Sequence, residues 1–445
     1  MTPTRRSLPS TVFVLVSLAG CGTVDVTPEE RSARDAIEAA TGLDLDVAPA
    51  DGSLTVEEAT RRALVAHPGI AAAFHEIGVA KAAWVRSGLP SNPVLNLAFF
   101  LPSGGGSAGV EAGLAASLLD LWRIPLREEV AAADLRATVL RVADLAAATA
   151  RDTRVAYFDT LAAAEELRLR REEEALRART RDQVAARRSA GRATEWEESV
   201  AESARLAAAL RVLEARRDAE RARRALAERM AAPFEDRTPL SSDLPAAAAV
   251  ATDDDSLASW VARALETRLE LRALREEIGA ARAREKLDAS AWLSRATVGV
   301  ATERADRPKG TPARNPSRSG PTVSVPLPVF DRGDAAAAEA RYRRERLELL
   351  LGAAELRVER EVRDAAGALA TAREAAAFCR DALVPQAERR LALARSAYEA
   401  GVGSITEVTR AERDLLDARR TELRTRREAA TASADLARAV GGPAP

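Results

Sequence analysis

The chain has 445 residues, of which 30% are charged and 4% aromatic, and its formal net charge is -1. A composition rich in Ala, Arg, Glu and Leu predicts long helices and coiled coil rather than a compact enzyme core, because Phe, Tyr and Trp dominate core burial. The near-zero net charge argues against a nucleic-acid partner, and two cysteines with two histidines are too few for a structural zinc site within one chain.

The first 20 residues have the features of a secretory signal peptide. Two arginines precede the apolar stretch 11–20, which is too short to span a membrane as a helix. The sequence LAGC at 18–21 is similar to the lipobox of bacterial lipoproteins, which implies that Cys21 carries a lipid such as palmitate and becomes the first residue. Gly22 stands where an inner-membrane retention signal would place Asp, so the resemblance favours the outer membrane. An ordinary signal peptide with an incidental Cys is the alternative.

A helix at about 61–82 and a strand hairpin at about 92–119 are expected next. Residues 94–101 and 110–118 alternate large apolar side chains with small or polar ones, and the turn-rich residues 102–109 join them. No apolar run after the signal is long enough to cross a bilayer as a helix, whereas this alternation is typical of membrane barrel strands. A soluble hairpin that covers a small core is the alternative.

A long helical hairpin is predicted at about 125–230. Its first helix begins at Pro125, a favourable first helical residue, and runs to Gly191 without an internal Pro or Gly. At 1.5 Å per residue this helix is about 100 Å long. Gly191 is expected at the tip, where the chain turns and a second helix returns. The Pro-rich residues 232–256 then form a linker, whose length suggests a partly ordered belt segment.

The chain repeats this order of elements. Residues 188–211 and 398–420 share one pattern, in which a glycine interrupts a long charged helix and the helix then resumes. Aligning the glycines superposes four pairs of residues: Gly191 on Gly401, Glu197 on Glu407, Ala201 on Ala411 and Glu202 on Glu412. Residues 61–82 align with 262–283 at nearly the same offset, so an internal two-fold repeat of a unit of roughly 200 residues is predicted. Chance alignment of low-complexity helices is the alternative.

The second copy is expected to contain a strand hairpin at about 291–330, with strands at 292–300 and 322–330, and a helical hairpin at about 333–440 with its tip at Gly401. Residues recur at intervals of seven along its two helices: Leu351, Val358, Ala365, Ala372 and Cys379 in the first, and Leu416, Leu423, Ala430 and Ala437 in the second. Apolar residues at intervals of seven indicate a coiled-coil seam, on which Cys379 is expected to be a small core residue. The predicted boundaries are 1–20 for the signal, 21–52 for the lipidated segment, 53–231 and 257–440 for the repeats, 232–256 for the linker and 441–445 for the tail.

The sequence contains none of the motifs that carry catalysis or bind a cofactor. There is no GxSxG nucleophile elbow, no Walker loop and no HExxH zinc motif. His67 and His75 are eight residues apart on one predicted helix, and His67 precedes a proline, so both are expected to be surface or capping residues. The sequence therefore predicts a protein that is not an enzyme and has no cofactor and no metal site.

Three segments of the chain carry a resemblance to a known family: LTVEEATRRALVAHPGI, PLPVFDRGDAAAAEARY and AYEAGVGSITEVTRAERDLL. They resemble, in that order, the opening helix, the strand-to-helix junction and the second tip of the TolC-like outer membrane factors, the outer membrane efflux proteins of efflux pumps and type I secretion. The resemblance covers nearly the whole mature chain. LLDLWRIPLREEV is similar to the lipoprotein subtype found in drug and heavy-metal efflux systems.

This resemblance implies a mainly α fold with a membrane β-barrel portion. Three protomers would each give four strands to one 12-stranded barrel, and their helical hairpins would form a tunnel across the periplasm. The four predicted strands by themselves also require more than one copy of the chain, because four strands cannot close a barrel and open edges are not tolerated in lipid.

The function implied is the outer membrane exit duct of a tripartite efflux or type I secretion system in a Gram-negative bacterium. Its implied partners are two further copies of the chain, outer membrane lipid, a periplasmic adaptor and an inner-membrane transporter of the RND type. A lipid-anchored periplasmic adaptor or a coiled-coil scaffold is the alternative. The adaptor would need a lipoyl-like β-domain, which is not recognisable in the sequence.

The resemblance also implies a gate at the hairpin tips. Glu407 lies where the family carries a tip aspartate that faces the pore, and three copies near the axis would raise one another's pKa. Glu197 would stand on the neighbouring tip, close to Tyr398, whose hydroxyl is expected to bond a carboxylate across the hairpins. The sequence departs from the family at Gly403, where a bracing Arg can occur, and at Arg410, where a second Asp can occur. A solvated charge at Glu407 is the alternative.

Overall fold

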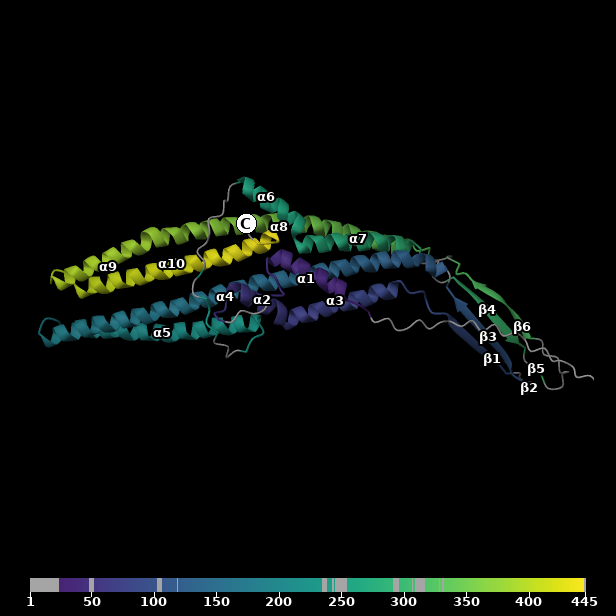
Figure 1. The fold of residues 1–445 in the computed structure, drawn as a ribbon, viewed down its shortest axis with the longest axis horizontal. Coiled ribbons are helices and arrows are strands. Elements are labelled where there is room, and N and C mark those ends of the chain that lie inside the picture. The colour runs from purple at the N-terminus through teal and green to yellow at the C-terminus, as the bar shows by residue number, and fades with distance from the viewer. Residues whose placement is uncertain are drawn as a thin grey trace, which may run out of the picture.

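The protein is a long body with a β-sheet at one end and two helical hairpin tips at the other (Figure 1). The structure is a computed structural model that describes residues 24–47, 52–101, 106–117, 119–233, 238–241, 244, 254–290, 296–305, 307–308, 317–327, 329 and 332–443. Four of the predicted features lie wholly or partly outside the described residues: the signal peptide, Cys21, residues 292–295 of the expected strand at 292–300, and much of the linker at 232–256.

Three helices precede the first strand: α1 (Thr27–Thr41), α2 (Val56–Ala66) and α3 (Pro68–Ser87). The chain bends between α2 and α3, where Nδ1 of His67 accepts a hydrogen bond from the Gly69 N–H at 3.1 Å and Pro68 occupies the first turn. His67 is therefore a capping residue, as predicted. In the described part of the chain no single helix has the length and hydropathy to span a membrane, although α2 and α3 would pass that test as a pair bent by 47°.

The helix α4 (Ile124–Ser189) is the central element of the body. It follows a short 3-10 turn, η1 (Leu119–Arg123), contains 66 residues and packs along its length against α5 (Glu195–Arg229), α3, α7 and α10. Its length follows from the absence of an internal breaker. Halfway along, Tyr157 and Phe158 are buried and lie edge to face, and the Tyr157 hydroxyl donates to the Leu54 carbonyl at 2.7 Å.

The described part of the linker packs against this same level of the body. Leu54 and Leu240 form a parallel β-bridge, and the side chains of Leu54 and Leu244 join the buried cluster around Tyr157 and Phe158. The linker thus contributes to the core at the middle of the helical body, between the sheet and the tips.

The sheet contains four antiparallel strands in the order β1-β3-β4-β6. They are β1 (Val94–Phe100), β3 (Gly109–Ala116), β4 (Thr297–Arg304) and β6 (Ser317–Ser324). A second ribbon pairs β2 (Gly106–Ser107) with β5 (Arg307–Pro308). Each hairpin of the chain thus supplies two neighbouring strands.

The second strand hairpin differs from the sequence prediction. The strand expected at 292–300 instead extends to Arg304, and the strand expected at 322–330 instead begins at Ser317. Both strands therefore lie closer to the connecting loop. The reason is the register: β4 must match the length of β3, and Arg304 pairs opposite Val110. The residues of β4 and β6 nearest the connecting loop are mostly polar, so apolar alternation does not predict that they belong to strands.

The second half of the chain repeats the element order. Its elements are α6 (Asp254–Thr267), α7 (Leu269–Ala289), the strands β4 and β6, α8 (Asp334–Phe378), a π turn η3 (Cys379–Leu383), α9 (Val384–Glu399) and α10 (Ile405–Val440). This order is consistent with the predicted internal repeat. The single helix expected from Gly333 to Gly401 is instead interrupted at the π turn.

The predicted seven-residue seam lies where α8 and α10 pack together, although its members Leu351 and Ala365 are only half-buried. Val358, Ala372 and Cys379 are buried in α8 and the π turn, as are Leu416, Leu423, Ala430 and Ala437 in α10. Small residues at many of these positions let the helices approach closely. Cys379 is 4% exposed and is a core residue, as expected.

Candidate functional site: the sheet and the hairpin tips

One face of the sheet is apolar and exposed to solvent in the protomer. The register places the following apolar side chains on it: Leu95, Leu97, Phe99, Val110, Ala112, Leu114, Ala116, Val298, Val300, Pro321 and Val323. At the loop end of β4 and β6 the same face ends in four polar side chains, Thr302, Arg304, Ser317 and Ser319. Leu97 is 57% exposed, Phe99 68% and Val323 70%. A continuous apolar surface of this kind is rare on a soluble monomer and marks contact with lipid or protein.

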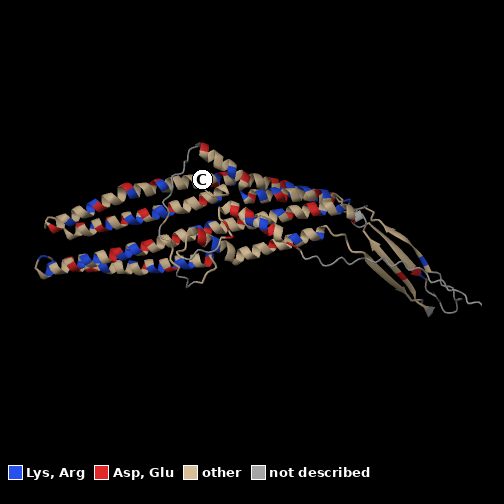
Figure 2. Cartoon of the chain, viewed as in Figure 1, with Lys and Arg blue, Asp and Glu red and all other residues tan. Residues whose placement is uncertain are grey.

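The opposite face carries small and polar side chains, among them Asn96, Gly113, Gly299 and Thr322. Charge is confined to the end of the sheet farthest from the helices, where Glu111, Glu303 and Arg318 lie side by side in one row (Figure 2). The edge strands β1 and β6 have no further strand partner among the described residues. The sheet is therefore an open, two-faced fragment with unpaired edges.

Each hairpin tip turns at a glycine in the left-handed region. The φ angles of Gly191 and Gly401 are 70° and 78°, which other residues adopt at a cost. The Arg192 N–H donates to the Arg187 carbonyl at 2.8 Å. The Val402 N–H makes the equivalent bond to the Ala397 carbonyl at 3.0 Å. Both tips thus close a Schellman motif, and both glycines lie where the sequence placed them.

After each glycine the returning helix starts with a capping box. The Glu197 N–H donates to the Thr194 hydroxyl at 3.2 Å, and the Glu197 carboxylate accepts the Thr194 N–H at 2.7 Å. Ser404 and Glu407 repeat the arrangement at 3.2 and 2.9 Å. The hydrogen bonds from Thr194 hold the pKa of Glu197 below its usual value. Both candidate gate carboxylates therefore fasten the first turn of their own helix.

The other candidate tip residues have partners that sequence reasoning did not foresee. The Arg187 guanidinium lies 4.0 Å from the centre of the Tyr398 ring. No hydrogen bond joins the Tyr398 hydroxyl to a carboxylate in the described part of this protomer. A Cβ at Gly403 would meet the Tyr398 nitrogen at 3.0 Å, so close packing explains the glycine there. Arg410 is exposed.

An apolar cluster joins the two hairpins just above the tips. It is formed by Val184 of α4, Ala201 of α5, and Ile405 and Val408 of α10, all buried. Burial of these side chains holds the tips side by side. The tips therefore act as a pair within one protomer rather than as two independent arms.

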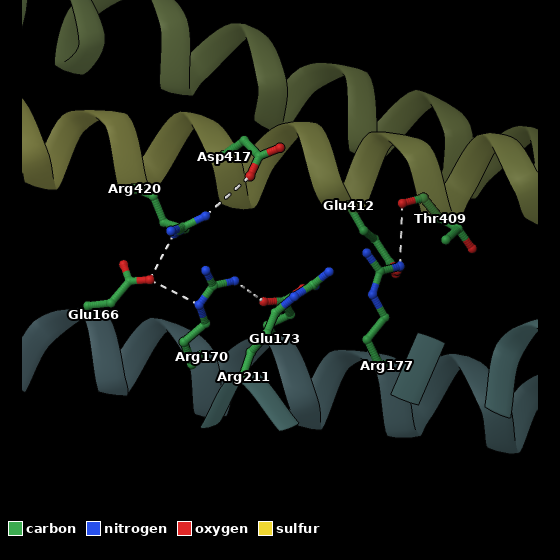
Figure 3. A network of polar contacts seen from close by, with 9 residues as sticks. All are labelled: Glu166, Arg170, Glu173, Arg177, Arg211, Thr409, Glu412, Asp417 and Arg420. Atoms are coloured by element: carbon green, nitrogen blue, oxygen red, sulfur yellow. Dashed lines mark hydrogen bonds and ion pairs between the residues drawn. The ribbon is translucent and has the colours of Figure 1, made fainter. Parts of the chain in front are cut away.

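A buried carboxylate that the sequence did not single out lies next to this cluster. Glu412 of α10 is 1% exposed, and its oxygens accept hydrogen bonds from Arg177 at 2.9 Å, Thr180 at 3.2 Å and Arg395 at 3.4 Å. Arg177 also donates to the Thr409 carbonyl at 3.4 Å (Figure 3). Burial raises the pKa of Glu412, although Arg177 and Arg395 oppose the effect, and burial lowers the pKa of Arg177. We name Arg177, Thr180, Arg395 and Glu412 the Glu412 cluster.

Charged residues continue along α4 above the Glu412 cluster. Glu166, Arg170, Glu173 and Arg177 are spaced four, three and four residues apart, which is the spacing of a coiled-coil seam. Arg420 of α10 donates to Glu166 at 2.8 Å, and Arg211 of α5 donates to Glu173 at 2.9 Å (Figure 3). The Arg211–Glu173 pair lies within the first hairpin. The contact between the hairpins is ionic at Glu166 and Arg177, whereas it is apolar both at the middle of the body and at the tips.

The described residues contain no group of three or more His, Cys, Asp or Glu placed to hold a metal ion.

Comparison with known sequences gives one family: residues 260–442 match the model described as "Outer membrane efflux protein". This part of the chain is thus similar to the outer membrane efflux proteins. No curated protein sequence matches the chain.

Solved structures share the fold over most of the chain. The open state of the MtrE outer membrane channel of Neisseria gonorrhoeae is 20% identical, with 87% of this chain and 89% of that chain covered and a TM-score of 0.70. The outer membrane protein VceC of Vibrio cholerae is 16% identical, with 87% and 96% covered and a TM-score of 0.69. The CmeC outer membrane channel of Campylobacter jejuni is 16% identical, with 87% and 85% covered and a TM-score of 0.70. The predicted family and the mainly helical fold with four strands are confirmed.

Proposed function

We propose that this protein is the outer membrane exit duct of a bacterial efflux system. The observation that carries the proposal is the sheet: four strands with an apolar, exposed outer face project from a helical body whose central helix is 66 residues long. The family match and the fold shared with outer membrane channels support the same conclusion. A lipid-anchored adaptor or a coiled-coil scaffold would leave the apolar sheet without a role.

Three copies close the barrel. In lipid every backbone N–H and C=O must find a partner, so the free edges of β1 and β6 must pair with neighbouring copies. Twelve strands follow from three protomers with four strands each. The polar face of the sheet, with Asn96 and Thr322, then lines the water-filled interior, and the apolar face meets the lipid.

The duct performs no reaction and uses no energy of its own. A periplasmic adaptor and an inner-membrane transporter of the RND type are the proposed partners, and they supply the driving force and most of the selectivity. Type I secretion would use the same duct with a different transporter. Purifying the protein with its bound partners and identifying them by mass spectrometry separates the two systems.

Lipid anchoring at Cys21 is the next proposal, and it rests on the LAGC sequence. Replacing Cys21 by serine is expected to abolish incorporation of labelled palmitate and to leave unprocessed precursor, because the thiol is the only acceptor in the lipobox. The measurement compares the label in the wild-type and C21S proteins after pulse labelling. Label that persists in C21S would eliminate the lipoprotein and leave an ordinary signal peptide.

A gate at the tips is a further proposal, in which three Glu407 side chains face the pore axis and attract cations. Because Glu407 belongs to a capping box, the substitution that tests its charge must keep the cap. Glu407→Ala would remove the cap as well as the charge, whereas Glu407→Gln keeps an acceptor for the Ser404 N–H and removes only the charge. Single trimers in planar bilayers are expected to lose cation selectivity and divalent-cation block in the Gln variant.

Glu197→Gln is the matched control for Glu407→Gln, because Glu197 occupies the same capping position on the first hairpin. Tyr398→Phe is expected to raise the open probability if its hydroxyl bonds a neighbouring copy. Wild-type selectivity in Glu407→Gln together with wild-type opening in Tyr398→Phe would place the gate elsewhere. In that outcome Glu407 is a capping residue with a solvated charge.

A further inference from the structure

The apolar face of the sheet is interrupted at one place. On β1 and β3 this face stays apolar as far as the connecting loop, where Phe99 pairs opposite Val110. On β4 and β6 it ends in four exposed polar residues, which we name the Arg304 patch: Thr302, Arg304, Ser317 and Ser319. Arg304 stands between Val110 of β3 and Ser317 of β6, so the patch borders apolar surface.

The charge of the Arg304 patch is not neutralised within the described part of the chain. The Ser319 hydroxyl donates to the Thr302 hydroxyl at 2.9 Å, whereas the Arg304 guanidinium has no hydrogen bond or ion pair among the described residues. The carboxylates of the described strands, Glu111 and Glu303, lie on the opposite face of the sheet. Arg304 is therefore the only charged side chain that the described strands place on the apolar face.

The patch lies at one boundary of the apolar band. The alternation continues past β6 to Val325 and Leu327, which are 54% and 80% exposed, and Leu327 follows Ser317 by ten residues. At about 3.4 Å per residue and a strand tilt of about 40°, this stretch spans about 25 Å along a barrel axis. The lipid-facing band of an outer membrane barrel is also about 25 Å tall. The Arg304 patch thus lies at the height where hydrocarbon gives way to headgroups.

The other boundary of the band is close to the helical body. Trp122 of η1, between the sheet and α4, is 85% exposed, and an exposed tryptophan is typical of a membrane–water interface. Figure 1 shows β4 and β6 extending away from the helices toward the far end of the molecule. Because the helical body extends into the periplasm in the proposed duct, the Arg304 patch is at the level of the outer leaflet.

A guanidinium beside hydroxyl groups fits a phosphate group. Arginine offers a planar set of N–H donors that matches two phosphate oxygens, and the hydroxyl of the paired residue Ser317 is a further donor. Below the patch, Val300 and Pro321 continue the apolar face and suit the acyl chains of the same molecule. A ligand with a phosphate directly above acyl chains satisfies both surfaces.

We propose that the Arg304 patch binds the phosphate group of an outer-leaflet lipid, so that each copy of the chain holds a phosphorylated lipid on the outside of the barrel. The inference rests on the proposed function for the orientation of the sheet in the membrane. The residues that form the site all belong to β4 and β6 of one copy.

Native mass spectrometry of the purified protein in detergent tests the site, with lipid A, the phosphorylated glycolipid of the outer leaflet, as the probe. The wild-type protein is expected to bind lipid A about tenfold more tightly than lipid A from which the phosphates have been removed, because charge-assisted hydrogen bonds are lost. Arg304→Gln is expected to remove this tenfold preference, and Arg304→Lys to retain part of it because the positive charge remains.

Arg318→Gln is the matched control, because Arg318 follows Ser317 on β6 and faces the opposite side of the sheet at the same level. It is expected to bind lipid A as the wild-type protein does. An equal loss in Arg318→Gln, or an undiminished preference in Arg304→Gln, would overturn the site. Inorganic phosphate at the same concentration is expected not to displace lipid A, since it lacks acyl chains, and displacement would overturn a lipid as the ligand.

Failure of this site and failure of the exit duct give different results. A trimer that conducts ions but binds lipid A and its dephosphorylated form equally overturns the phosphate site and leaves the duct. A chain that stays monomeric overturns the duct. The preference for phosphorylated lipid A can still be compared between the wild-type and Arg304→Gln monomers, and its absence from both would overturn the site as well.

Discussion

Replacing Glu412 by alanine is expected to lower the free energy of unfolding by about 3–5 kcal/mol, because it leaves Arg177 buried without its carboxylate. Glu202, which aligns with Glu412 in the first copy of the repeat, provides the control. Glu202 is exposed, so Glu202→Ala is expected to cost at most about 1 kcal/mol. Denaturant unfolding of the helical body, followed by far-UV circular dichroism, measures both.

A double variant distinguishes a buried pair from a general loss of packing. Adding Arg177→Ala to Glu412→Ala removes the unpaired charge, so the two changes together are expected to cost less than the sum of the single changes. Strict additivity, or an equal loss in Glu202→Ala and Glu412→Ala, would contradict a specific contact between Arg177 and Glu412.

The second large effect is expected at the sheet. Leu97 lies in the middle of β1 on the apolar face, and Leu97→Arg is expected to cost about 2–4 kcal/mol per copy because the charge would face the lipid near the middle of the bilayer. In a trimer the cost is repeated three times, so assembled trimer in the outer membrane should be almost lost. Heat-dependent gel mobility of membrane fractions measures it.

The neighbouring residue provides the matched control. Asn96 lies on the same strand but faces the opposite side, which would line the aqueous interior. Asn96→Arg is therefore expected to assemble at close to the wild-type level and to alter ion selectivity only. If Leu97→Arg assembles as well as Asn96→Arg, the apolar face does not meet lipid.

The sequence was sufficient for the features that depend on local signals. Gly191 and Gly401 mark turns because only glycine adopts a left-handed conformation without strain, and the uninterrupted stretch after Pro125 predicts one long helix. The capping boxes at Thr194 and Ser404 are equally local, and the Ser/Thr-x-x-Glu spacing was present to find them.

Features that depend on packing were not predictable in this way. Glu202 and Glu412 occupy matching positions in similar sequences, yet only Glu412 is buried. It lies where α10 of one hairpin meets α4 of the other, whereas Glu202 lies at the margin of the contact between α5 and α4, paired with Arg181 and Arg205. Apolar alternation predicts the second strand hairpin too far from its connecting loop. The ends of β4 are set instead by its register with β3. Pro385 was visible in the sequence, but the π turn that precedes it, Cys379–Leu383, has no comparable local signal.

The mass of the purified protein in mild detergent tests whether three copies of this chain form one duct. Light scattering corrected for bound detergent is expected to give three chains per particle, since the free edges of β1 and β6 must be paired in lipid. A stable monomer that retains the circular dichroism signal of its strands would contradict a shared barrel, and with it the proposed exit duct.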